Sequence, residues 1–114
     1  MKRVQLLTLF CTATFLQAAY ADTFKLVSYN IRNFDYDSRS HTPTNKKHLV
    51  YTIDQANPDL MAVQEINNKF EFEKMIDRNF QGDFETALSH CGGSHDQHLG
   101  FVYKTKALKL LSFT

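Results

Sequence analysis

Two strand-like stretches joined by an amphipathic helix are the feature that most constrains the fold of this 114-residue chain. Residues 24–30 alternate roughly by two and are rich in β-branched and aromatic side chains, which favours a strand. Residues Lys46–Ala56 place apolar side chains on one helical face, and residues 60–63 form a short apolar run typical of a buried strand. Because an intervening helix lets two strands lie parallel, the pattern predicts a strand-helix-strand unit.

The remainder of the chain extends this alternation of strands and helices. Residues 35–45 are polar and predict a loop, in which Thr44 or Asn45 can cap the first helix. Residues Lys69–Phe80 carry a second apolar helical face, and residues 89–95 form a Gly-rich turn. Further strand candidates cover residues 84–88, 99–104 and 107–113. This order is that of an α/β or α+β domain in which the helices cover one face of a sheet.

The first 21 residues have the pattern of an export signal. Lys2 and Arg3 form a positive start, residues 4–16 are mostly apolar and uncharged, and Ala19 and Ala21 are small residues at the positions that a signal peptidase reads. The apolar stretch is shorter than the ~20 residues that a membrane-spanning helix needs. We therefore expect cleavage before Asp22 and an exported protein, periplasmic or extracellular, without a membrane span.

Composition excludes some classes of protein and leaves the chain dependent on its core. The 13 Lys and Arg residues nearly balance 12 Asp and Glu residues, so nothing resembles a basic tail for nucleic acid or a long acidic run. Removing the 21 signal residues from 114 leaves 93, with Cys91 as the only cysteine. No disulfide can form within that part, and a hydrophobic core must supply its stability.

Polar side chains stand at the ends of the two strands that the first helix connects. Asn30 ends the first strand, and Glu65 follows the second. If the strands are parallel neighbours, both side chains emerge at the carboxyl end of the sheet, where open α/β sheets bind ligands. An amide oxygen and a carboxylate suit Mg²⁺ or another hard divalent cation. The alternative is ordinary strand-end chemistry, with Asn30 as a turn former and Glu65 as solvated surface.

Three segments resemble the endonuclease/exonuclease/phosphatase superfamily, whose fold is that of deoxyribonuclease I. They are Lys-Leu-Val-Ser-Tyr-Asn-Ile-Arg-Asn-Phe at 25–34, Asn-Pro-Asp-Leu-Met-Ala-Val-Gln-Glu at 57–65, and Leu-Gly-Phe-Val-Tyr-Lys at 99–104. The resemblance implies the amino-terminal half of a four-layer α/β sandwich with alternating strands and helices. It also implies metal-dependent hydrolysis of phosphodiesters, and the export signal favours a secreted or periplasmic endonuclease that acts on DNA.

The resemblance also assigns roles to single residues. Asn30 is expected to be the amide that binds or orients at the metal site, and Glu65 the carboxylate that holds Mg²⁺, or Mn²⁺ or Ca²⁺. Arg32 is expected to reach a substrate phosphate, with a solvated strand-end side chain as the alternative. Gln97 stands where an acid often supports the catalytic His; an amide can accept a hydrogen bond but cannot stabilise an imidazolium as a carboxylate does.

Two further motifs of the superfamily, Gly-Asp-x-Asn and Ser-Asp-His, do not occur in the sequence. We therefore expect residues 22–114 to be the truncated amino-terminal part of such a domain, inactive alone, with a carboxy-terminal half as a possible complement. The alternatives are a lipid or inositol phosphodiesterase or phosphatase of the same fold, and a non-catalytic truncated or split-partner protein.

The histidines suggest a second metal hypothesis. His90, Cys91, His95 and His98 gather around two glycines, a residue set that can bind zinc, but the spacing fits no standard zinc motif and favours a solvated loop. Pairing of Cys91 with a downstream cysteine is a further alternative. The two remaining histidines, His41 and His48, are expected at the surface.

Overall fold

The structure, a computed structural model, describes residues 23–35 and 43–113. The expected signal at residues 1–21 therefore lies outside the described residues, as does His41. The elements in chain order are β1 (Leu26–Phe34), α1 (Lys46–Ala56), β2 (Leu60–Ile66), α2 (Lys69–Phe80), β3 (Phe84–Leu88), the 3₁₀ turn η1 (Gly93–His95) and β4 (His98–Lys104).

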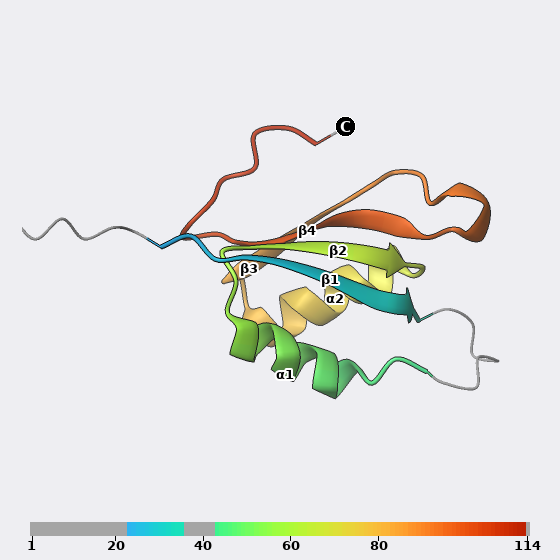
Figure 1. The fold of residues 1–114 in the computed structure, drawn as a ribbon, viewed down its shortest axis with the longest axis horizontal. Helices are drawn as coiled ribbons and strands as arrows, with labels where there is room; N and C mark the ends of the chain where they lie inside the picture. The colour runs from blue at the N-terminus through green and yellow to red at the C-terminus, as the bar shows by residue number, and fades with distance from the viewer. Residues whose placement is uncertain (1–22, 36–42, 114) are drawn as a thin grey trace, which may run out of the picture.

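The chain folds into an α/β structure with one four-stranded mixed sheet in the order β1-β2-β4-β3. Strands β1 and β2 are parallel and pair from Leu26 with Leu60 onward, with α1 as their connection. Strand β4 is antiparallel to both of its neighbours, β2 and β3. Both helices lie on the same side of the sheet (Figure 1). The predicted strand-helix-strand unit and the one-sided covering by helices are confirmed.

Local capping sets the helix boundaries where the sequence predicts them. The Asn45 side chain accepts a hydrogen bond from the His48 backbone N–H at 3.0 Å, which caps the start of α1. Thr44, the other candidate, instead accepts from the Asp35 N–H. Asn57 adopts the left-handed conformation that ends α1 just before Pro58. The two strands of the parallel pair run longer than predicted, through Phe34 in β1 and through Ile66 in β2.

The hydrophobic core lies between the helices and the sheet. Phe34 of β1 and Phe72 of α2 are fully buried and meet edge to face, with their ring centres 5.1 Å apart. Ile53 of α1 and Met61 and Val63 of β2 are buried in the same cluster. Each such side chain contributes about 1.5–3 kcal/mol by leaving water. Since Cys91 is the only cysteine among the described residues and is free, this cluster is the stabilising core of the part that the structure describes.

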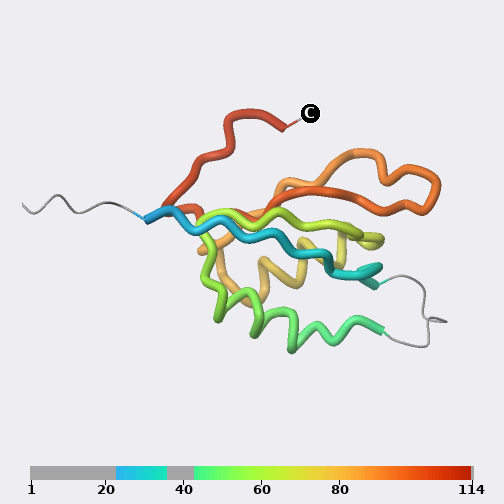
Figure 2. The backbone as a smooth tube through the Cα atoms, viewed as in Figure 1, coloured from blue at the N-terminus to red at the C-terminus, as the bar shows by residue number. Residues whose placement is uncertain are grey.

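The prediction of a strand over residues 107–113 is wrong. After a turn at 105–107 this segment has no regular secondary structure, and Phe113 packs edge to face on Phe101 with ring centres 6.3 Å apart. The segment leaves the end of β4 and runs on the side of the sheet opposite the helices (Figure 2). Strand propensity is overridden because both sides of β4 are already occupied by β2 and β3.

The side of the sheet without helices is only partly covered. Residues 108–110 lie over it and, with Leu60, Ala87, Phe101 and Tyr103, enclose a cavity of about 140 Å³. Leu26 and Leu99 remain 65% and 58% exposed. The sheet is therefore apolar on both sides but sealed only on the helix side.

Asp59 ties three strands together at the end of the sheet opposite the carboxyl ends of β1 and β2. Its carboxylate accepts a hydrogen bond from the Lys25 backbone N–H at 2.8 Å and lies 3.5 Å from the Lys104 ammonium. Its own backbone N–H donates to the Lys25 carbonyl, and its carbonyl accepts from the Lys104 N–H. The hydrogen bond from Lys25, followed by the charge of Lys104, lowers the pKa of Asp59 below its usual value.

We expect Asp59→Asn to destabilise the fold in a pH-dependent manner. Because the folded-state pKa is lowered, the carboxylate stabilises the fold fully above its unfolded pKa near 3.8, and this contribution is lost as the pH falls through the folded pKa. Urea unfolding of the wild type and the variant at a series of pH values measures the difference, which should shrink below pH 3.8. Asp54→Asn on α1 is the control. A difference that does not change with pH would contradict the role of this carboxylate.

Candidate functional site

Both parallel strands depart from regular geometry at their carboxyl ends. The register between β1 and β2 is regular up to Asn30 and Gln64 and resumes only at Phe34 and Ile66. Within this irregular stretch, Arg32, Asn33 and Glu65 all have a positive φ, between 54° and 62°. Non-glycine residues seldom adopt this conformation, and such strained positions gather at functional sites. The deformation therefore marks this corner of the sheet as a candidate site.

Asn30 and Glu65 lie side by side at this corner, as the sequence predicts for parallel neighbours. The Asn30 amide Nδ2 donates to Glu65 Oε1 at 2.7 Å. The second carboxylate oxygen, Oε2, accepts from the Asn33 backbone N–H at 3.1 Å, and Asn30 Oδ1 accepts from the Arg32 N–H at 2.8 Å. Two donors of β1 thus hold the carboxylate of β2 in one orientation, and the bond from the Arg32 N–H fixes the Asn30 amide. Direct metal ligation by either residue stays a prediction.

Gln97 reaches the same corner from the segment before β4. Its side-chain amide Nε2 donates to Asn33 Oδ1, and its backbone N–H donates to the Gly92 carbonyl at 2.7 Å. The loop that carries it is tied to the end of β2, because Asn67 Nδ2 donates to the His95 carbonyl at 2.9 Å. Gln97 therefore supports the turn of β1 around Asn33. Support of a catalytic imidazole by Gln97 stays a prediction.

Sequence reasoning did not identify Asn33 and Asn67 as part of this site. Asn33 bonds Glu65 with its backbone and Gln97 with its side chain, so it links three segments of the chain. The sequence signal that could have identified Asn33 is the second Asn of Asn-Ile-Arg-Asn at 30–33. The Arg32 side chain is exposed at the corner, a position compatible with its expected contact to a phosphate.

The donor set fits a hard cation that keeps much of its water. Glu65 is partly exposed, and each of its oxygens retains a free acceptor position beside the hydrogen bond described above. Mg²⁺ commonly binds through one or two carboxylates and takes its remaining ligands from water and phosphate oxygens. Over residues 23–35 and 43–113, however, no three His, Cys, Asp or Glu side chains come together as a closed metal cage.

The zinc hypothesis finds no support in the part of the chain that the structure describes. His98 is buried, with Nδ1 2.8 Å from the Ser89 carbonyl and Nε2 3.1 Å from Asp96 Oδ1. Both ring nitrogens are thus engaged. Cys91 is exposed, and His95 Nδ1 lies beside the Ser94 hydroxyl. Cys91 and His95 lie in an exposed loop, as the sequence predicts, whereas His98 is a buried structural residue of β4. His48 lies exposed near the start of α1, as expected.

Comparisons with protein families, with curated proteins and with solved structures found no match for this chain. The described residues also contain no helix that is both long enough and apolar enough to cross a bilayer.

We expect Asn30→Ala to lower the free energy of unfolding by about 1–2 kcal/mol, because it removes the hydrogen bond to Glu65 Oε1 and the acceptor of the Arg32 N–H. Chemical denaturation measures this loss. Ser28→Ala is the matched control: Ser28 lies on the same side of β1, and its hydroxyl only accepts from Gln64 Nε2 at 3.3 Å. The control should stay within about 0.5 kcal/mol of the wild type. Equal effects of the two substitutions would show that Asn30 does not organise the corner.

Proposed function

We propose that this chain is the metal-holding part of an exported endonuclease/exonuclease/phosphatase domain that hydrolyses phosphodiesters, with DNA as the first substrate to test. The observation that carries this proposal is the Asn30–Glu65 hydrogen bond at the carboxyl ends of two parallel strands. This pair joins a carboxylate to an oriented amide beside strained backbone on both strands.

Each residue of the corner has a distinct task in this proposal. Glu65 holds the cation, while Asn30 Nδ2 and the Asn33 N–H fix the orientation of its carboxylate. Arg32, exposed on the same turn, binds a non-bridging phosphate oxygen of the substrate. A divalent cation bound here supplies polarisation of the phosphate and stabilises charge on the departing oxygen. Asn30 orients Glu65 through Nδ2, while its Oδ1 accepts one bond from the Arg32 N–H and keeps a second acceptor position.

The sheet supports the wider fold of the proposal, a half of a four-layer α/β sandwich. Its helix side is sealed, whereas the opposite side exposes Leu26, Leu99 and Phe101. Apolar side chains on the outer side of a sheet are what packing against a second sheet would cover. A carboxy-terminal half that supplies this second sheet would also bring the missing Gly-Asp-x-Asn and Ser-Asp-His groups.

The same exposed side favours a second candidate function, a non-catalytic chain that binds a complementing partner. The corner around Glu65 has no imidazole hydrogen-bonded to it among the described residues, and His98 is engaged by Ser89 and Asp96. A water nucleophile would lack its general base. In this case the chain contributes a folded layer and a metal-binding corner without turnover of its own.

We expect Mn²⁺, used as a paramagnetic probe for Mg²⁺, to broaden NMR signals of residues at the ends of β1 and β2. Glu65→Gln should weaken this binding about tenfold or more, because it removes the charge that attracts the cation. Glu73→Gln on α2 is the matched control, as an exposed acid away from the corner. Broadening that is unchanged by Glu65→Gln would contradict the metal-holding role, whether or not the chain is active.

For catalysis we expect little or no cleavage by the purified chain alone with Mg²⁺, because no imidazole is hydrogen-bonded to the corner within residues 23–35 and 43–113. Plasmid DNA, sphingomyelin and inositol phosphates tested side by side distinguish the nuclease from the lipid and sugar-phosphate alternatives. Efficient plasmid cleavage that Glu65→Ala abolishes would show that the chain is a complete enzyme, contrary to this expectation. Cleavage that survives Glu65→Ala would point to a contaminating nuclease.

A further inference from the structure

The free edge of β3 is the first of two features that point to an interaction surface. Strand β3 pairs with β4 and lies at the end of the sheet order. The Ser89 N–H donates to the Leu99 carbonyl at 2.8 Å, and the Thr105 N–H donates to the Asp83 carbonyl at 3.0 Å. Because backbone groups alternate in an antiparallel pair, odd-numbered residues of this strand face β4. The N–H and C=O groups of Phe84, Thr86 and Leu88 therefore point outward, away from β4.

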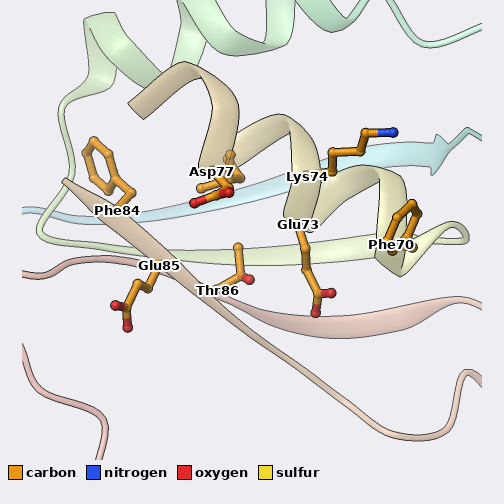
Figure 3. A pocket seen from close by; sticks show the side chains of 8 residues that line it. Phe70, Glu73, Lys74, Asp77, Phe84, Glu85 and Thr86 are labelled. Carbon is orange, nitrogen blue, oxygen red and sulfur yellow. The ribbon is translucent and has the colours of Figure 1, made fainter. Parts of the chain in front are cut away.

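A groove runs beside this edge, between α2 and β3. It encloses about 560 Å³ and has Ile76 and Phe84 among its lining side chains. Glu73 and Asp77 extend from α2 on the side that faces β3 (Figure 3). Glu85 of β3 and Lys74 also line the groove, and the Lys74 ammonium lies 3.4 Å from Glu71. The groove thus combines apolar walls, three carboxylates against one ammonium group, and an open strand edge.

The second feature is segment 107–113, which has the sequence of a strand but no strand partner. It contains four aliphatic residues and Phe113, and no acidic residue. Leu111 is 90% exposed. Lys106, just before the segment, and Lys109 within it give it a positive charge. The segment runs on the side of the sheet without helices, whereas the groove lies on the helix side, so one chain does not bring the two together (Figures 1 and 2).

We propose that segment 107–113 of one copy of this chain adds as an extra strand to the β3 edge of a second copy, in the groove against α2. Backbone bonds to Phe84, Thr86 and Leu88 hold the added strand, and Lys109, with Lys106 just before the segment, meets Glu73 and Asp77. Segment 107–113 gains the backbone hydrogen bonds of a strand, which it cannot make to β4 because both edges of β4 are already paired. The outward backbone groups of β3 gain hydrogen-bond partners. Because the two surfaces differ, the contact is head to tail and propagates into chains of copies.

Sedimentation velocity on the full chain over a range of micromolar concentrations tests the proposal. We expect self-association that Glu73→Lys combined with Asp77→Lys weakens at least about tenfold, a change of about 1.4 kcal/mol. Thr86→Pro should have the same effect, since it removes an outward N–H without removing a bond to β4. Asp54→Lys on α1 is the control and should associate like the wild type. Circular dichroism checks that each variant is folded.

A charge-swap experiment separates this interface from association through the exposed side of the sheet. The variant with Glu73→Lys and Asp77→Lys, and a second variant with Lys106→Glu and Lys109→Glu, should each associate weakly alone. Mixed together they should associate again, because each groove then meets a segment of opposite charge. A chain that stays monomeric at all concentrations overturns the proposal. Two other results also overturn it: self-association that Glu73→Lys with Asp77→Lys leaves unchanged, and a mixture of the two variants that does not associate.

Discussion

The parallel pairing of β1 with β2 is the constraint on which the rest of the structure depends. Parallel neighbours need a long crossover, and α1 supplies it on one side of the sheet. The next crossover, through α2, leads to β3, which runs parallel to β2 with β4 inserted between them. Both helices consequently cover the same side. The single core, the exposed opposite side and the meeting of Asn30 with Glu65 all follow from this arrangement.

The candidate site combines a rigid base with a strained end. Asp59 locks the beginnings of β1 and β2 to the end of β4, while the carboxyl ends of β1 and β2 break register and place three non-glycine residues at positive φ. Hydrogen bonds from Asn30, Asn33 and Gln97 offset this strain and aim the Glu65 carboxylate. Regular strands would have satisfied these backbone groups by themselves. Their departure from the ladder is what makes an oriented carboxylate available for a cation.

Incomplete coverage of the sheet links the proposed function to the proposed self-association. One side exposes apolar side chains that a second sheet would cover, and one edge exposes backbone groups that an added strand would pair. The two surfaces differ in chemistry: the side is apolar, whereas the groove at the edge carries Glu73 and Asp77. A partner for the side needs apolar area, and a partner for the edge needs strand propensity and positive charge.

Local sequence determined the helices of this protein, because caps such as Asn45 and Asn57 act on neighbouring backbone groups. It also determined that Asn30 and Glu65 lie in adjacent strands toward their carboxyl ends, since apolar periodicity and a connecting helix imply parallel pairing. Tertiary structure alone decided the strand ends at Phe34 and Ile66, the bonds that Asn33 makes to Glu65 and Gln97, and the loss of a strand at 107–113. These outcomes depend on which backbone groups are already paired by distant segments, and periodicity within one segment carries no record of that pairing.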